Sequence, residues 1–241
     1  MKNPKTRKAG IDRQRDESLI QKRVFALGHF LIILFSVWLI FMKGWTILGD
    51  LFGKDWSFAD QNRATVLLAV AFFYWLRHLV TLFYLLKRKV EWGEVFGLLF
   101  FIAFVEIGLL LIGGGAFRNY AIRLGKLDAL ALILLLLGSY LNSFSEIQRK
   151  KWKANSTNKG HCYTEGLFRY SMHMNYFGDV VLFTGWCLFT YNYWTLLLPL
   201  FMLLSFIYAH IPGLDSYLAE RYGEEFEHYA KKTKKIIPFI Y

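Results

Sequence analysis

The chain has 241 residues, of which 55% are hydrophobic and 19% aromatic, and this excludes an ordinary soluble domain of the same length. Its net charge of +11 could suit nucleic acid, but the basic residues fall in short segments between long apolar blocks, and no nucleic-acid-binding module accompanies them. That distribution orients a membrane protein and attracts anionic lipid, so we expect membrane lipids and no nucleic acid as partners.

The N-terminal half predicts a basic tail followed by four membrane spans. Residues 1–23 hold eight Lys or Arg against three acids and are expected to form a basic cytosolic tail. The run 24–42 then supplies 19 mostly apolar residues, enough to cross about 30 Å of hydrocarbon. Further spans are expected at 64–86, 94–112 and 127–141. Residues 24–141 therefore form a predicted N-terminal membrane domain on the substrate side.

Two oppositely charged residues lie inside these spans, where a charge costs free energy unless it is paired or functional. Counting ~1.5 Å per residue from the cytosolic ends puts Arg77 about 13 Å deep and Glu106 about 18 Å deep. An arginine side chain can bridge that difference. We therefore expect Arg77 and Glu106 to face the bundle interior as a pair, either as a structural ion pair or in contact with a substrate.

The C-terminal region, 142–241, continues the helical pattern. The fourth span is expected to extend as a helix to about residue 153, and two tight apolar runs near 176–191 and 194–211 predict a helical hairpin. A further amphipathic helix with a break at Gly223 and a basic tail should follow.

Together these elements predict an all-α fold: a polytopic membrane helix bundle of about six transmembrane helices with a cytosolic C-terminal helical segment. With both termini cytosolic, 22 of the 29 Lys and Arg lie on the cytosolic side, as the positive-inside rule requires. No cleavable signal peptide is expected, because the first 23 residues lack an apolar centre. The two cysteines, Cys162 and Cys187, have no paired spacing and predict neither a disulfide framework nor a metal site.

A polar, aromatic-rich segment at 166–179 stands where the fifth span begins. It resembles the Arg-His-Pro-Asn-Tyr-x-Gly-Asp/Glu signature of the membrane reductases that include steroid 5α-reductases and sterol reductases. Isoprenylcysteine carboxyl methyltransferases and phospholipid methyltransferases share a related Arg-His-Pro-x-Tyr-x-Gly core. The matching residues are His173, Asn175, Tyr176, Gly178 and Asp179. Met172 stands where the signature has Arg, and Met174 where it often has Pro.

Two other stretches carry the same resemblance, which covers about 140–241. The residues that fit the terminal pattern of the family are Asp215, Arg221, Tyr222, Gly223, Tyr229 and Pro238. Gln148, Arg149 and Lys153 share one broad face of the predicted helix and resemble the Gln-Lys-x-x-x-Arg segment that contacts NADPH in sterol reductases. A basic, amide-bearing face suits an anionic phosphate cofactor, and it would also suit lipid headgroups.

The resemblance implies an NADPH-dependent reductase of a carbon–carbon double bond in a lipophilic, sterol- or isoprenoid-like molecule taken from the bilayer. Such a reaction needs a cofactor at the cytosolic mouth and an acid near an apolar pocket. The expected catalytic residues are Glu106, Tyr140 and His173, the first two as acids, with Tyr120 as a further candidate acid. The expected cofactor-binding residues are Gln148, Arg149, Lys153, Asn175, Tyr176, Gly178, Asp179, Asp215, Arg221, Tyr222 and Tyr229.

The resemblance leaves a second enzyme class open, an S-adenosylmethionine-dependent methyltransferase of isoprenylcysteine or phospholipid type. Its cofactor would lie over the turn 173–178, with Glu224 and Glu225 near the amino-acid portion. The reductase is preferred because Asn175 and Asp179 follow the reductase form of the signature. A non-catalytic lipid-binding membrane protein is a third interpretation, favoured by Met172. The substrate and the oligomeric state stay open.

Overall fold

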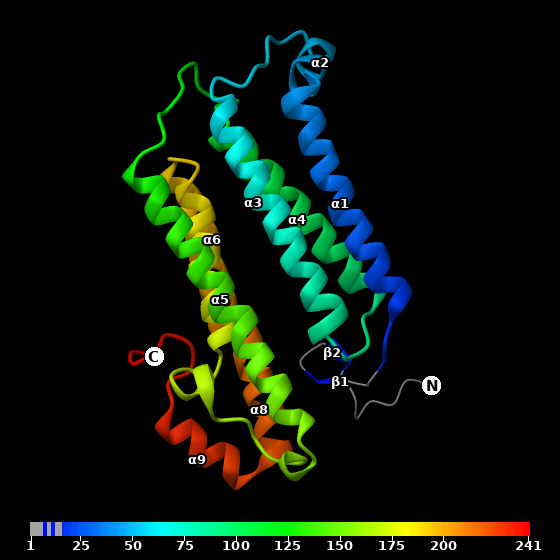
Figure 1. Ribbon diagram of the computed structural model, residues 1–241, viewed down its shortest axis with the longest axis vertical. Helices are drawn as coiled ribbons and strands as arrows, with labels where there is room; N and C mark the ends of the chain where they lie inside the picture. Colours follow the sequence, from blue (N-terminus) through cyan, green and yellow to red (C-terminus); the bar gives the residue numbers. More distant parts are fainter. Residues whose placement is uncertain (1–6, 9–10, 13–15) are drawn as a thin grey trace. The chain divides into compact units, whose positions relative to one another are not determined.

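The protein is described by a computed structural model that covers residues 7–8, 11–12 and 16–241 (Figure 1). Within this part the chain is helical, apart from one antiparallel pair of two-residue strands, β1 (Arg7–Lys8) and β2 (Ile11–Asp12). The predicted all-α class is confirmed. The remainder of the expected basic tail, 1–6, 9–10 and 13–15, lies outside the described residues.

The chain divides into two compact units. The N-terminal unit comprises 16–132 and 185–196, and the C-terminal unit comprises 133–184 and 197–241 together with the described residues before 16. The division falls inside two helices, α5 (Lys126–Ala154) and α6 (Met174–Leu188). The domain boundary expected at 141 also lies within α5.

Three long helices form the N-terminal unit: α1 (Leu19–Phe41), α3 (Gln61–Leu79) and α4 (Trp92–Gly113) pack against one another (Figure 1). The short helix α2 (Gly44–Leu51) follows α1, and a π-helical turn, η2 (Val80–Leu85), extends α3. The helices pack because each is apolar over most of its length and buries one side against its neighbours.

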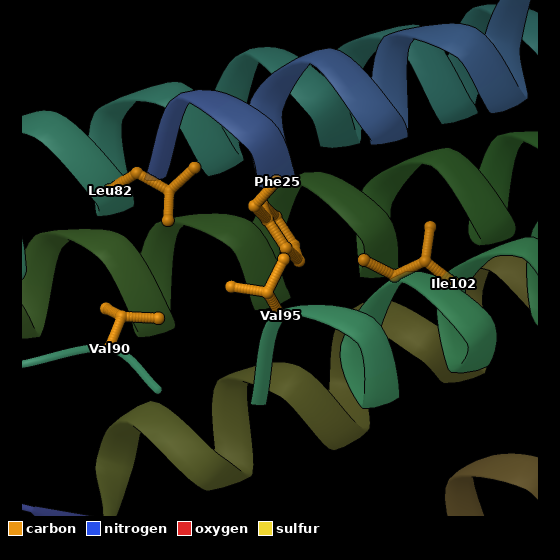
Figure 2. Close-up of a cluster of buried hydrophobic side chains, with 5 residues drawn as sticks. All are labelled: Phe25, Leu82, Val90, Val95 and Ile102. Atoms are coloured by element: carbon orange, nitrogen blue, oxygen red, sulfur yellow. The ribbon is translucent and has the colours of Figure 1, made fainter. Parts of the chain in front are cut away.

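Five side chains make one core of this unit, and Figure 2 shows them gathered between the helices: Phe25, Leu82, Val90, Val95 and Ile102. They come from α1, from η2, from the segment before α4, and from α4 itself. On the opposite side of α4, Phe100 and Phe104 are 76% and 73% exposed. Large exposed apolar side chains of this kind are typical of helix faces that meet lipid.

The start of α1 is fixed by polar contacts and not by hydrophobic packing alone. The Oδ1 atom of Asp16 accepts hydrogen bonds from N and Oγ of Ser18, at 2.6 and 2.9 Å. The Nζ atom of Lys22 donates to the carbonyl oxygen of Leu86 at 2.8 Å. Residues 19–23, expected as the end of the tail, are therefore the first turns of α1.

The C-terminal unit contains the polar end of α5 and the remaining helices of the chain. These are the first part of α6, then α7 (Leu197–Ser205), α8 (Ile211–Tyr222) and α9 (Glu224–Lys232). Short turns connect or extend them: η3 (Ser156–Asn158), η4 (Gly166–Arg169) and η6 (Phe206–His210). The turn η5 (Tyr193–Leu196), directly before α7, belongs to the N-terminal unit. The predicted break at Gly223 is confirmed, because that residue has φ 54° and separates α8 from α9.

In the described part of the chain, five helical segments are long and apolar enough to cross a membrane: 19–41, 61–85, 92–113, 126–154 and 193–222. They support the expected integral membrane protein and its helical bundle. The fifth expected span corresponds to α6, which has 15 residues and is shorter than the ~20 residues that usually cross a bilayer. The fourth span does continue as one helix beyond residue 153, as predicted.

Candidate functional site

The signature segment is held in place by the end of the chain. The backbone N–H groups of Met172 and His173 donate to the carbonyl oxygens of Lys234 and Lys235, at 2.8 and 3.0 Å. Ile236, the next residue, has no exposed surface. Two backbone hydrogen bonds therefore tie the terminal residues to the signature segment just before α6.

At the centre of this segment is a buried histidine–carboxylate pair. His173 is 1% exposed, and its Nε2 atom lies 2.8 Å from Oδ1 of Asp215 on α8. The His173 ring stacks on Tyr176 with 5.6 Å between centroids, and Tyr176 stacks on Phe206 at 4.5 Å. Three of the expected site residues are thus brought together, and Asp215 orients the imidazole from the side opposite its own backbone.

The side chain of Gln148 is hydrogen-bonded to the loop that leads into the signature residues. Its Oε1 atom accepts a hydrogen bond from the N–H of Leu167 at 3.0 Å. Gly166 has φ +58°, and a Cβ there would lie 2.6 Å from this same Oε1 atom. Glycine is required because the turn adopts a left-handed conformation and approaches the amide closely. The amide oxygen of Gln148 therefore has a structural partner within the loop.

Arg149 lies beside the same loop. Its guanidinium pairs with Glu146, three residues earlier on α5. The guanidinium carbon lies 5.4 Å from the ring centroid of Phe168. The aromatic ring and the carboxylate hold the side chain in one position while 40% of it stays exposed.

Around Tyr222 of α8 the structure gathers further positive charge. The Nζ atom of Lys153 lies 3.5 Å from the hydroxyl of Tyr222, and the guanidinium carbon of Arg221 lies 5.5 Å from the ring centroid of Tyr222. Arg221 also donates to the hydroxyl of Tyr217 at 2.6 Å. Arg149 and Arg221 are both close enough to repel the Lys153 ammonium. We call Arg149, Lys153 and Arg221 the basic cluster, and all three were expected at the cofactor site.

Tyr229 has a buried, structural position. Its hydroxyl donates to the carbonyl oxygen of Phe168 at 2.5 Å, and burial raises the pKa of this phenol. It packs with Cys162, Met172 and Phe226 in one apolar cluster. Met172 is 5% exposed there. The departure from the signature arginine thus has a physical reason, since a thioether fits an apolar cluster and a guanidinium does not.

Close packing of α5 on α6 accounts for the glycine of the signature. A Cβ on Gly178 would lie 2.5 Å from the backbone N of Asn142, and a Cβ on Gly138 would lie 2.2 Å from the backbone N of Leu182. The side-chain amide of Asn142 donates to the carbonyl oxygen of Asn175 at 2.9 Å. Small residues at such crossings let two membrane helices approach. The cofactor roles of Asn175, Gly178 and the half-buried Asp179 stay predictions.

A cavity of about 400 Å³ opens next to the apolar cluster. Among the residues that line it are Arg169, Glu225, His228, Tyr229 and Lys232. Glu225, one of the two acids expected in the methyltransferase interpretation, also lies 3.5 Å from Nδ1 of His161. The cavity therefore combines one acid with several basic groups at the polar end of the C-terminal unit. Within the described chain no group of three or more His, Cys, Asp or Glu side chains could hold a metal ion.

The expected pairing of Arg77 with Glu106 is wrong. Glu106 is 4% exposed, and its Oε1 atom lies 2.7 Å from Nε2 of His29 on α1, while its Oε2 atom has no hydrogen-bond partner among the described atoms. The guanidinium carbon of Arg77 lies 5.0 Å from the ring centroid of Tyr74. Depth along a span gave no information about which way each side chain points around its helix.

The other expected acids are more exposed. Tyr140 on α5 is 50% exposed and stacks on Phe144 with 4.9 Å between centroids. Tyr120 is 60% exposed, and the guanidinium carbon of Arg118 lies 5.8 Å from its ring centroid. In the membrane setting both rings would meet lipid or a substrate and not the protein core.

Sequence reasoning missed a buried charge network at the start of α3. Arg63 has no exposed surface and pairs with both Asp60 and Asp128. Burial raises the pKa of Asp60, but backbone N–H groups and the guanidinium groups of Arg63 and Arg118 hold it below its usual value. The ring of Tyr191 lies 4.2 Å from the guanidinium carbon of Arg63. The sequence signal for this network was Asp60, an aspartate at a helix N-cap position three residues before Arg63.

Comparison with known proteins connects these features to a family. A family model described as "Protein of unknown function (DUF1295)" matches residues 87–233. The protein-S-isoprenylcysteine O-methyltransferase of Schizosaccharomyces pombe is 31% identical over 115 residues, which cover 46% of this chain and 49% of that protein. The delta(14)-sterol reductase ERG24 of Saccharomyces cerevisiae is 33% identical over 79 residues, which cover 32% of this chain and 18% of that protein.

The chain thus spans about half of one relative and less than a fifth of the other. The two relatives belong to the two enzyme classes whose signatures the segment 166–179 resembles. The resemblance to the superfamily that joins sterol reductases with isoprenylcysteine methyltransferases is therefore confirmed.

Proposed function

The chain belongs to the DUF1295 family, and from that premise we propose that it is a membrane enzyme that uses NADPH to reduce a carbon–carbon double bond in a lipophilic, sterol- or isoprenoid-like molecule. The sterol reductase among its relatives supports the reaction class. The helices that are apolar enough to span a membrane support a substrate that reaches the enzyme from the bilayer.

The basic cluster is the observation that carries this proposal. Arg149, Lys153 and Arg221 lie at the polar end of α5 and on α8, and Glu146 is the carboxylate that pairs with one of them. Three cations with one paired carboxylate leave an excess of positive charge, and this suits the pyrophosphate and 2′-phosphate of NADPH. The residues present therefore fit an anionic, phosphate-rich cofactor.

NADPH, when bound, supplies the hydride. In this proposal the basic cluster and the NH₂ group of Gln148 hold the phosphates, while Tyr222 covers the adenosine end. Asn175, with Tyr176, Gly178 and Asp179, contacts the nicotinamide or ribose. Tyr229 keeps the loop at Phe168 in place through its hydroxyl.

Asp215 fixes the orientation of His173, which contacts the cofactor in the proposal. Glu106 and Tyr140 are the proposed acids. Glu106 is buried, where a general acid for an apolar substrate is shielded from water.

A methyltransferase that uses S-adenosylmethionine is the second candidate. The isoprenylcysteine methyltransferase among the relatives supports it, and so does Glu225 at the 400 Å³ cavity. A carboxylate can hold the amino group of S-adenosylmethionine, which has no phosphate and carries a positive sulfonium. The positive excess of the basic cluster favours NADPH over this cationic cofactor.

The test is a binding titration of both cofactors against the purified protein and three variants. Arg149→Ala should weaken NADPH binding about tenfold or more, because it removes charge-assisted hydrogen bonds of roughly 1.5–3 kcal/mol. High salt should weaken NADPH binding to the wild type as well. Lys151→Ala, which removes an exposed charge nearby on α5, is the matched control and should have a much smaller effect.

Glu225→Gln should leave NADPH binding unchanged. Tight binding of S-adenosylmethionine that survives Arg149→Ala and is lost in Glu225→Gln, with no binding of NADPH, would replace the reductase by the methyltransferase. If neither cofactor binds, both enzyme proposals fail, and the non-catalytic lipid-binding interpretation takes their place.

A further inference from the structure

Inside the N-terminal unit, three ionisable side chains from three different helices form a continuous chain of contacts. The Nε2 atom of His29 on α1 lies 2.7 Å from Oε1 of Glu106 on α4. The other ring nitrogen of His29, Nδ1, lies 3.1 Å from Nδ1 of His78 on α3. Both nitrogens of His29 are therefore engaged, one toward a carboxyl group and one toward a second imidazole.

The chain of contacts is shielded from water. His29 has no exposed surface and Glu106 is 4% exposed. The His78 ring meets Phe25 edge-on at 5.3 Å and Tyr74 at 4.3 Å between centroids. In such surroundings water cannot replace a hydrogen bond. Each of the two contacts must therefore have one donor and one acceptor, and the hydrogens on the three side chains are arranged accordingly.

Counting hydrogens gives two arrangements. A neutral imidazole has one N–H group and one nitrogen lone pair. When Glu106 is ionised, His29 donates from Nε2 to the carboxylate, so its Nδ1 must accept from Nδ1–H of His78. When one more proton is present, Nδ1 of His29 carries a hydrogen, whether the added proton rests on Oε1 of Glu106 or on Nε2 of His29. The Nδ1 atom of His78 is then the acceptor, and the hydrogen of the His78 ring is on Nε2.

We propose that His78, His29 and Glu106 form a single proton-binding site, in which uptake of one proton reverses the hydrogen bonds along the chain and changes the tautomer of His78. One proton is taken up in total, and it binds at Nε2 of His78. Each of the two bridging hydrogens moves across its hydrogen bond to the former acceptor atom, and the negative charge at the carboxyl end is neutralised. Loss of the proton from Nε2 of His78 lets both bridging hydrogens shift back and restores the first arrangement.

The Oε2 atom of Glu106 is buried and has no hydrogen-bond partner among the described residues. Arg77, which precedes His78 on α3, carries a permanent positive charge, and its guanidinium carbon lies 5.0 Å from the ring centroid of Tyr74. The pH response therefore belongs to the three side chains as one coupled site. This inference goes beyond the proposed function and holds for either cofactor.

The experiment is a pH titration of the full protein in detergent micelles, with ¹⁵N-labelled histidine. Nuclear magnetic resonance reports the tautomer of each ring, and infrared difference spectroscopy reports the carboxylic acid band of Glu106, identified by its loss in Glu106→Gln. In the wild type the signals of His29, His78 and Glu106 should change with one common midpoint. Separate midpoints for the three groups would overturn the proposal without the use of any further variant.

Two variants sharpen the result. His78→Phe keeps an aromatic ring but removes the acceptor that the Nδ1–H of His29 needs in the proton-loaded arrangement. Because a buried N–H without an acceptor is costlier than a free lone pair, the Glu106 midpoint should move to lower pH by about half to one unit. Phe25→Leu alters the packing around the rings and no polar atom, so it should leave the midpoint in place. An unchanged Glu106 midpoint in His78→Phe refutes the coupling.

Discussion

Replacing Arg63 by methionine tests whether the buried charge network at the start of α3 holds the N-terminal unit together. Methionine keeps the length of the aliphatic stem and removes the guanidinium. The side chain of Arg63 donates to the carbonyl oxygens of Phe189 and Ile122 at 2.9 and 3.0 Å, in addition to its ion pairs with Asp60 and Asp128. The substitution therefore removes the partner of two carboxylates and two carbonyl groups at once.

The expected loss of stability depends on which partners each carboxylate retains after the substitution. Asp60 still has Arg118 at 3.1 Å. Asp128 keeps the N–H of Gly125 and the hydroxyl of Tyr191, at 2.8 and 2.9 Å, but no cation. Removing one partner of a buried ion pair typically costs about 3–5 kcal/mol, since the remaining charge is left buried and uncompensated. We expect Arg63→Met to destabilise the unit by that amount.

Unfolding can be followed through the reactivity of the two cysteines. Both are buried, with Cys187 in the N-terminal unit and Cys162 in the C-terminal unit. In a Cys162→Ser background, a fluorogenic thiol reagent reports the unfolding around Cys187 as the temperature rises. The midpoint of that reaction should fall by many degrees in Arg63→Met. The control, Arg123→Ala, removes an exposed arginine of the same unit and should change stability by less than about 0.5 kcal/mol.

A second substitution identifies the origin of the effect. Adding Asp128→Asn to Arg63→Met neutralises the stranded carboxylate and should recover part of the lost stability, because the buried charge is the main cost. The reasoning is refuted if Arg63→Met behaves like Arg123→Ala, or if the double variant is no more stable than Arg63→Met.

Three further predictions concern packing, reactivity and topology. Gly178→Ala should destabilise the C-terminal unit by about 1–3 kcal/mol through overpacking, which the thermal reaction of Cys162 in a Cys187→Ser background measures. Gly97→Ala, with nothing near its Cβ, should be neutral or stabilising when Cys187 reports on the N-terminal unit. Burial raises the pKa of the Cys162 thiol from 9.0 to about 11, so alkylation at neutral pH should be about a hundredfold slower than for an ordinary thiol; ordinary rates would contradict this. Cysteines introduced at Ser57 and Asn158 should be labelled from opposite faces of the membrane, and labelling from one face would exclude the predicted orientation.

The sequence predicted the helices well because length and hydropathy determine them locally. Apolar runs of about 20 residues gave the spans, and the continuation of the fourth span as a helix to about residue 153 agrees with α5, which ends at Ala154. The break at Gly223 was also predictable, since its φ of 54° is unfavourable for other residues. The length of α6 was not predictable, because its N-terminal end depends on the hydrogen bonds between 172–173 and the C-terminal residues.

The pairing of buried charges could not be predicted in the same way. Counting residues gives the depth of a side chain in the bilayer, but its direction around the helix depends on how the helices are rotated against one another. Arg77 and His78 are neighbours on α3, and only the packed structure turns His78 toward His29. The polar residues His29 and His78 inside apolar spans were the available signal, and they were not used because no local spacing links them.

The signature residues also explain why one motif occurs in two enzyme classes. Gly178 is required by the approach of α5, and His173 is tied to Asp215 and to the backbone of Lys235. These contacts build the start of α6 whatever cofactor binds, so the motif is informative about architecture and weakly informative about the reaction. The charge of the cofactor must instead be matched by residues outside the motif. In our proposal those residues are the basic cluster, and for that reason the proposal depends on Arg149 more than on any residue of the signature.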